Sequence, residues 1–217
     1  MFETALTYND LMFLAKGAGM TLMVTAISVF IGTVLGIIFG VFRYQVGALW
    51  AMPLTFVLDV FRSIPLLIQL VLANAFITTV LKIKVSGLTV ACGVLSLYTA
   101  AYCAEIVRGG IEAVPLPLRR AARSLGMTWG QDMTSVVMPL ATRVALPSWI
   151  GLALGVMKDS ALVYIVQVVE LLKSTQILIT RLQEPLFLLM ICGLFYFVIS
   201  FPIARFGGYL EKRWSND

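Results

Sequence analysis

The sequence contains no histidine, so catalysis by histidine and metal sites built on histidine are both excluded. Charged residues make up only 12% of the 217 residues, about half the share that is usual in a soluble domain. No segment follows the Gly-x-x-x-x-Gly-Lys-Ser/Thr pattern of a phosphate-binding loop. We therefore expect that the chain does not hydrolyse ATP itself and is not a soluble globular protein.

Cysteine is also scarce. Cys92, Cys103 and Cys192 lie in apolar runs without a Cys-x-x-Cys spacing, so we expect small buried hydrophobic side chains and no metal site. The first residues lack a basic segment and an Ala-x-Ala cleavage site, which predicts that no signal peptide is removed.

Hydrophobic residues are what the sequence has in abundance, at 60%, with a mean hydropathy of +0.96. The net charge of +5 does not indicate nucleic-acid binding, because the basic residues follow the edges of the apolar runs. Since a membrane-spanning helix needs about 20 apolar residues, the pattern predicts five transmembrane helices. The expected spans are residues 17–42, a second span from Pro53 to residue 81, 85–104, 144–159 and 185–204. We predict an all-α, polytopic membrane protein with one domain, residues 1–217.

The distribution of lysine and arginine predicts the orientation of these spans. If the N-terminus lies outside, ten of the 16 basic residues fall on the inner side and six on the outer side. This agrees with the positive-inside rule. We therefore expect an external N-terminus and a cytoplasmic C-terminus.

Two sets of glycines predict close contacts between helices. Gly32, Gly36 and Gly40 repeat every four residues on one face, and small residues so spaced let a second helix approach closely. Gly151 and Gly155 form a similar pair in the fourth span. The alternative is that glycine is simply common in membrane helices.

Several polar residues and one proline mark the second and third spans. Pro65 either kinks the second span beside a transport pathway or is merely tolerated there. Asp59 and Arg62 are three residues apart, as are Glu105 and Arg108, so each pair can meet across one helical turn. For Glu105 and Arg108 we favour an ion pair over contact with a ligand.

The longest polar and basic segment, residues 112–139, reads as two short helices joined by a turn. Pro117 suits the first turn of a helix, and Gly126 suits the left-handed position that closes one. Thr128 with Gln131 forms a capping box for the next helix. A helix, a glycine turn and a second helix between two spans form a shape that suggests docking of a partner.

This segment resembles the cytoplasmic loop of ATP-binding-cassette importer permeases. The resemblance rests on Ala121-Ala122, Gly126, Val136, Met138 and Pro139, with matching spacing. Two departures are Arg120, where glutamate is usual, and Pro117-Leu118, where Gly-Gln is usual. The resemblance implies that the loop seats a coupling helix in an ATPase subunit. The residues expected to dock are Ala121, Ala122, Arg123, Leu125, Gly126, Met127 and Thr128.

Four further segments resemble the permeases for histidine, glutamate, glutamine, arginine and opines. They are Phe61 to Leu67, Ala101 to Gly110, Lys158 to Val163 with Val169-Glu170-Leu171, and Tyr209 to Arg213. Ala161 replaces a common serine. The resemblance implies a type I importer permease in the bacterial inner membrane that moves a polar amino acid delivered by an extracytoplasmic solute-binding protein. Residues 61–65 and 162–164 favour glutamate or aspartate.

The resemblance also implies which partners the chain has and which subunit binds ATP. We expect two copies of the ATPase subunit and a second permease, identical or paralogous, as protein partners, and the lipid bilayer as the surroundings. We do not expect binding to nucleic acid. ATP and Mg belong to the ATPase, and no cofactor or metal is expected in this chain.

Charged residues in an apolar span identify a candidate substrate pathway. Lys158 and Asp159 each cost at least ~2.5–3.5 kcal/mol near the centre of a membrane helix, so such residues usually serve a function. Together they offer the charges opposite to those of a zwitterionic amino acid. The alternative is an ion pair or a snorkelling helix end. Tyr102 and Gln69 either add polar groups to the pathway or satisfy neighbouring helices.

The basic residues of the docking segment and two aspartates leave alternatives open. Arg119, Arg120 and Arg123 either bind acidic groups of the ATPase or lipid phosphates, or only determine topology. A second function class is an intramembrane hydrolase with Asp59 and Asp159 as a dyad, although neither lies in a Gly-x-Gly-Asp setting. A passive pore or structural subunit is a third, and the docking segment argues against it.

Overall fold

The computed structural model describes residues 6–215, and every regular element within that range is helical. Four helical stretches in this range are long and apolar enough to cross a membrane: Tyr8–Gln45, Gly87–Glu112, Trp129–Val166 and Pro185–Trp214. A fifth span is formed by Leu49–Ser63 and Leu66–Val80 if this pair, bent by 106°, is counted as one. The predicted all-α fold with five spans is confirmed. The first five and the last two residues of the predicted domain lie outside the described part.

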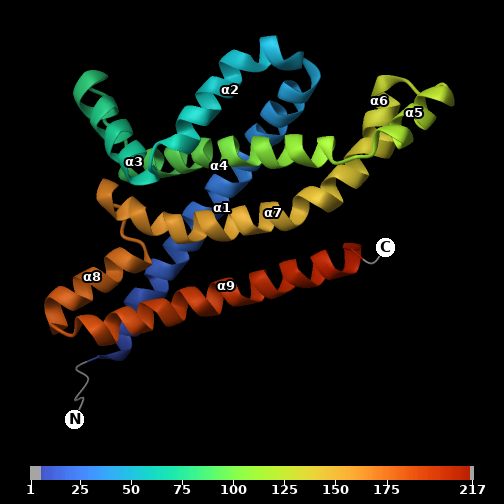
Figure 1. Cartoon of the computed structure of the whole chain (residues 1–217). Helices are drawn as coiled ribbons and strands as arrows, with labels where there is room; N and C mark the ends of the chain where they lie inside the picture. Colours follow the sequence, from blue (N-terminus) through green and yellow to red (C-terminus); the bar gives the residue numbers. More distant parts are fainter. Residues whose placement is uncertain (1–5, 216–217) are drawn as a thin grey trace.

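Helix α1 (Tyr8–Gln45) begins nine residues before the predicted span. The Asp10 carboxylate accepts hydrogen bonds from the backbone N–H and the hydroxyl of Thr7, at 2.9 and 2.8 Å, which fixes the helix start at Thr7. At 1.5 Å per residue the helix is about 57 Å long, well beyond the ~30 Å of a bilayer core. Figure 1 shows it crossing behind the other spans at a slant.

Helix α4 (Gly87–Glu112) packs along α1 through the predicted glycine face. A Cβ added at Gly36 would lie 2.5 Å from the Cβ of Cys103, and one at Gly40 would lie 2.7 Å from the Ala104 carbonyl oxygen. The close contact predicted for Gly32, Gly36 and Gly40 is therefore confirmed.

Gly151 and Gly155 make no such contact within the described chain. A Cβ at either position would meet nothing within 4 Å in the described chain. Spacing alone shows that small residues share a face, but it does not show which face meets a neighbour. In that helix the buried positions are others, such as Ile150 and Val156.

The second span is broken at Pro65, as predicted. Helix α2 (Gly47–Ser63) ends before Ile64, and α3 (Leu66–Ala75) starts after Pro65 and runs into the π-helical turn η1 (Phe76–Val80). Proline has no N–H to donate and disfavours helical backbone in the residue before it. In Figure 1 α2 and α3 rise from the body of the molecule as two arms.

The C-terminal half holds the fourth predicted span and a further helix after it. Helix α7 (Met138–Asp159) ends at the Lys158-Asp159 pair, continues into the 3-10 turn η3 (Ser160–Val166), and is followed by the amphipathic helix α8 (Leu171–Leu182). Glu170, fully buried, caps α8 by accepting the N–H groups of Leu172 and Lys173 at 2.7 Å.

Helix α9 (Pro185–Ser215) completes the bundle. It lies against α7 and α8, and it ends toward the same end of the molecule as the segment 112–139 (Figure 1). All three cysteines were expected to be buried. Cys103 and Cys192 are buried, and Cys92 is partly buried.

The glycine face makes a testable prediction. Gly36→Leu forces α1 away from α4, because the new Cβ would overlap Cys103, and overpacking of this kind costs about 1–3 kcal/mol. We expect a drop of several degrees in the melting temperature of the purified protein in detergent. Gly19→Leu, in the same helix but with nothing within 4 Å, is the matched control and should melt as the parent does. Equal melting temperatures for the two variants would contradict the close contact.

Candidate functional site

The segment 112–139, called the docking loop below, folds locally as predicted. Helix α5 (Leu116–Ser124) closes at Gly126, whose φ is +81°. The N–H of Gly126 donates to the Arg123 carbonyl at 3.0 Å, and the N–H of Met127 donates to the Ala122 carbonyl at 3.2 Å. These two bonds form the Schellman closure that favours glycine.

The second docking helix differs in one respect. Helix α6 (Trp129–Asp132) starts with the predicted capping box of Thr128 and Gln131. It does not stop, however, because the π-helical turn η2 (Met133–Val137) carries it directly into α7. Pro139, which has no N–H to donate, falls directly after this turn, where the regular hydrogen-bond ladder is already interrupted.

Arg119 is engaged inside the protein. Its Nη2 lies 3.2 Å from Oδ2 of Asp132, and its Nη1 donates to the Tyr44 hydroxyl at the end of α1. Asp132 is 1% exposed, so this pair is a buried brace between the docking loop and α1. Arg120 and Arg123, by contrast, are exposed.

The docking loop presents most of its predicted contact residues to the outside. Those exposed are Ala121, Arg123, Leu125, Gly126 and Thr128, whereas Ala122 is buried and Met127 half-buried. Leu125 is 83% exposed, so a large apolar side chain of this loop is left uncovered by the described chain. The docking loop therefore has an exposed face with apolar and basic side chains, and no described part of the chain covers this face.

The polar candidates Gln69 and Tyr102 meet at the break in the second span. The Gln69 Nε2 donates to the carbonyls of Phe61 and Ile64, at 2.6 and 2.7 Å. The Tyr102 hydroxyl donates to the Arg62 carbonyl at 3.3 Å. Both side chains thus satisfy carbonyl groups that the end of α2 leaves without helical partners.

Tyr102 also connects the break to Asp159. Its ring centroid lies 4.8 Å from that of Tyr98, one helical turn earlier on α4, and the Tyr98 hydroxyl lies near the Asp159 carboxylate. Lys158, next to Asp159, is exposed. We call Gln69, Tyr98, Tyr102 and Asp159 the break cluster.

Tyr98 is the member of the break cluster that sequence reasoning missed. Its position four residues before Tyr102 places both tyrosines on one face of α4, and this spacing could have identified it.

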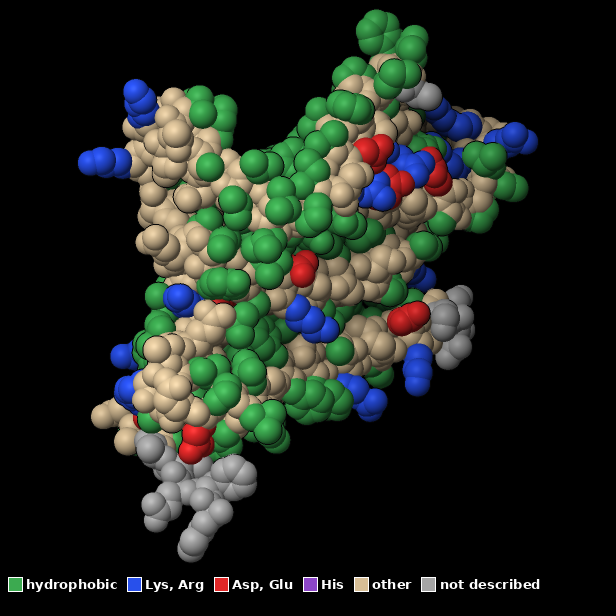
Figure 2. Space-filling model, turned by 60° about the vertical axis from the view of Figure 1, so that its left-hand side comes forward, with side chains coloured by type: hydrophobic (Ala, Val, Ile, Leu, Met, Phe, Trp, Pro, Cys, Tyr) green, Lys and Arg blue, Asp and Glu red, His purple; other side chains and the backbone are tan. Residues whose placement is uncertain are grey.

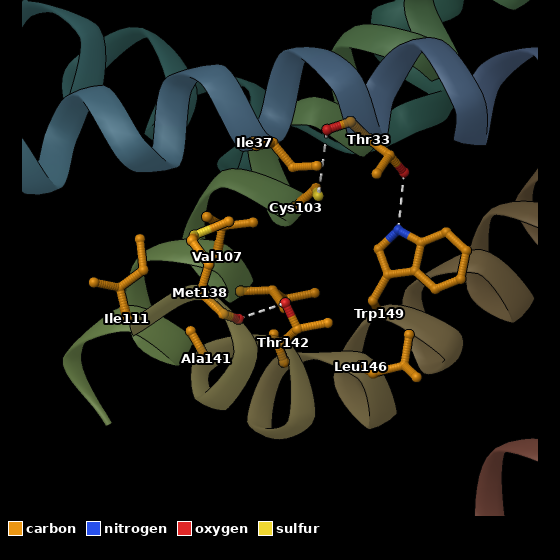
Figure 3. A pocket seen from close by; sticks show the side chains of 12 residues that line it. Thr33, Ile37, Cys103, Val107, Ile111, Met138, Ala141, Thr142, Leu146 and Trp149 are labelled. Atoms are coloured by element: carbon orange, nitrogen blue, oxygen red, sulfur yellow. Dashed lines mark hydrogen bonds between the residues drawn. The ribbon is translucent and has the colours of Figure 1, made fainter. Parts of the chain in front are cut away.

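An apolar cavity lies elsewhere in the molecule. It holds about 230 Å³ between α1, α4 and α7, and its labelled lining residues are shown in Figure 3. Trp149 Nε1 donates to Thr33 Oγ1 at 2.8 Å, and Thr142 Oγ1 donates to the Met138 carbonyl at 2.7 Å. The lining is otherwise apolar and carries no charged residue, so it offers no charge partner to a polar amino acid.

A bent second span, a docking loop between two spans and a polar cluster beside the bend can now be compared with known proteins. Residues 32–216 match the family described as "Binding-protein-dependent transport system inner membrane component". The chain belongs to this family.

Relatives of this permease are named as amino acid transporters. It is 32% identical over 216 residues to the probable amino-acid ABC transporter permease YckA of Bacillus subtilis, which covers 100% of this chain and 95% of YckA. It is 29% identical over 219 residues to the glutamate/aspartate import permease GltK of Escherichia coli O157:H7, with 98% of each chain covered. It is 27% identical over 212 residues to the arginine transport permease ArtQ of Bacillus subtilis, with 97% of each covered.

Solved structures agree with the fold. A chain of the "Crystal structure of an amino acid ABC transporter with histidines" has a TM-score of 0.85 and 26% identity, over 97% of this chain and 100% of that one. The inward-facing MetNI methionine transporter, at 22% identity, shares the fold with a TM-score of 0.74 over 94% of this chain and 99% of that one.

This permease is therefore the transmembrane subunit of an amino acid ABC transporter, and ATP hydrolysis belongs to a separate subunit. The family implies an ATPase, a binding protein and a second permease as partners. Membership of this family also argues against the two alternative functions, an intramembrane hydrolase and a passive pore.

The positive φ at Gly126 makes a prediction about docking. Gly126→Val should misdirect α6, because a β-branched residue in the left-handed region costs about 1–2 kcal/mol, whereas nothing within 4 Å obstructs its side chain. We expect membrane insertion to be normal and co-purification of the ATPase to be lost. Gly126→Asn is the control, since asparagine tolerates this conformation and should keep the complex. Loss of the ATPase with both variants would point to a steric requirement at the surface instead.

Proposed function

We propose that this permease imports a polar amino acid across the bacterial inner membrane, receiving it from a solute-binding protein outside. In this proposal a second permease, identical or paralogous, completes the pathway. Two copies of the ATPase bind the docking loops of the two permeases, and residues 112–139 are the docking loop of this chain. The observation that carries the proposal is the position of Asp159, which ends α7 beside Tyr98 and close to the break in the second span.

The break cluster offers complementary charges for an amino acid. The Asp159 carboxylate can receive an α-ammonium group. The first N–H groups of α3 have no acceptor within their own helix and carry the positive end of the helix dipole, so they suit an α-carboxylate. The two features lie close together, because α3 packs against η3, the turn directly after Asp159.

Among polar amino acids we propose glutamate or aspartate as the substrates to test first. An acidic amino acid carries a second carboxylate, and Lys158 is the exposed cation next to Asp159. Arginine and glutamine are the alternatives, since relatives named for glutamate/aspartate, arginine and glutamine have similar identity to this chain.

Reconstitution tests the proposal directly. The permease is co-purified with its ATPase and placed in vesicles, and ATP hydrolysis is measured with the binding protein and a panel of amino acids. We expect stimulation by one polar amino acid and its uptake into the vesicles. No stimulation by any amino acid on the panel would overturn the proposed substrate class.

The role of Asp159 and Lys158 is tested by charge removal. A hydrogen bond to a charged group is worth about 1.5–3 kcal/mol, so Asp159→Asn should raise the apparent KM for the amino acid at least about tenfold. Lys158→Met should raise it for an acidic substrate and leave other amino acids less affected. Glu184→Gln and Lys84→Met are matched controls away from the break cluster. Unchanged affinity and selectivity in both test variants would remove this pair from the site.

A further inference from the structure

The inner ends of three helices are joined through one carboxylate. Glu105 on α4 accepts from Arg43 of α1, at 2.9 Å between Nη1 and Oε2, and from Arg108 of its own helix. Arg62 of α2 lies 3.5 Å from the same carboxylate. Arg43 also donates its Nε to the Thr55 hydroxyl on α2 at 3.0 Å. We call Arg43, Arg62, Glu105 and Arg108 the charge hub.

The positive and negative charges in and around the hub are equal in number only when Glu105 is present. Two further carboxylates lie at its rim, Asp59 paired with Arg62 and Glu112 paired with Arg108, so three cations face three anions. The Arg43 side chain is 8% exposed, and the carboxylate that it meets is Glu105. The predicted pairs Asp59–Arg62 and Glu105–Arg108 are confirmed, but each is one part of a larger network.

The hub is tied to the docking loop through the last turn of α1. Tyr44, the residue after Arg43, accepts a hydrogen bond from Arg119, which is paired with the buried Asp132. Adjacent helical residues point about 100° apart, so α1 is held on two sides at once. One side meets the docking loop and the other meets α4 and α2.

The hub is tied to the break cluster through Arg62. The Arg62 carbonyl accepts from Tyr102, and its guanidinium lies 5.6 Å over the Tyr102 ring. The Tyr102 ring packs at a tilt against the ring of Tyr98, which lies near Asp159. The path from Asp132 to Asp159 therefore consists of side-chain contacts and one backbone link, between Tyr44 and Arg43.

A cavity of about 630 Å³ lies beside the hub, and its lining includes Arg43, Thr55, Asp59 and Arg108 from α1, α2 and α4. Figure 2 shows charged side chains of both signs gathered beside one of two projecting lobes, with a hydrophobic hollow between the lobes.

We propose that Glu105 is a positioning residue for transport. It holds the inner ends of α1, α2 and α4 together, so that a displacement of the docking loop by the ATPase reaches the break cluster and changes the site at Asp159. This inference rests on the proposed function, because it assigns a cause to the coupling between ATP hydrolysis and amino acid movement. A carboxylate that merely anchored topology would affect assembly but not the number of amino acids moved per ATP.

Glu105→Gln in the reconstituted complex tests this role. We expect ATP hydrolysis without substrate to persist, its stimulation by the binding protein and amino acid to be lost, and the amino acid transported per ATP to fall about tenfold. Glu211→Gln, an exposed carboxylate near the end of α9, is the matched control and should behave as the parent does. Normal transport per ATP in Glu105→Gln would overturn the proposal.

A double-mutant cycle separates positioning from instability. Arg43→Gln and Glu105→Gln should each uncouple transport, and the double variant should lose little more than either one, since non-additivity marks residues that act together. If Glu105→Gln does not assemble, Glu105→Asp keeps the charge at a shorter reach, and an intermediate loss of coupling is expected. Full coupling with Glu105→Asp, or additive losses in the double variant, would contradict the role. Failure of the proposed function is distinguishable, because the unchanged complex would then show no stimulation by any amino acid.

Discussion

The close approach of α1 and α4 is the constraint on which the rest of this permease depends. Lipid tails are as apolar as the helices, so burial of apolar surface does not drive helices together in a membrane, and small residues that bring backbones close do so instead. Gly40 faces the Ala104 carbonyl, and three residues later Arg43 meets Glu105, the residue after Ala104. The glycine face therefore sets the register that makes the charge hub possible. It also places Thr33 where Trp149 of α7 can donate to it.

A second constraint acts at the break in the second span. Backbone groups at membrane depth must find partners inside the protein, so an irregular turn is tolerated only where side chains or water satisfy it. Gln69 and Tyr102 do this for three carbonyls between Phe61 and Ile64. The structural role that the sequence offered for these two residues is therefore the one that the hydrogen bonds show, and the proposed substrate site lies beside the same break.

The sequence predicted features that depend on neighbouring residues. The spans, the turn at Gly126, the capping box at Thr128 and the ion pairs three residues apart all follow from local spacing. It did not predict the pairing of Arg43 with Glu105, 62 residues apart, or of Arg119 with Tyr44, 75 residues apart. Periodicity reports which residues share a face of one helix but not the register between two helices. Gly151 and Gly155 are an example, since they share a face that meets no helix of the described chain.

The docking loop and Asp159 are two parts of one helical stretch. Because α6 runs through η2 into α7, the backbone from Trp129 to Asp159 is continuous and about 46 Å long at 1.5 Å per residue. The π-helical turn η2 and Pro147 both interrupt the regular hydrogen-bond ladder of this stretch. The stretch connects the docking loop to α7 alone, however. Arg119 and the charge hub connect the same docking loop to α1, α2 and α4, so both walls of the break cluster are mechanically joined to the surface that the loop exposes.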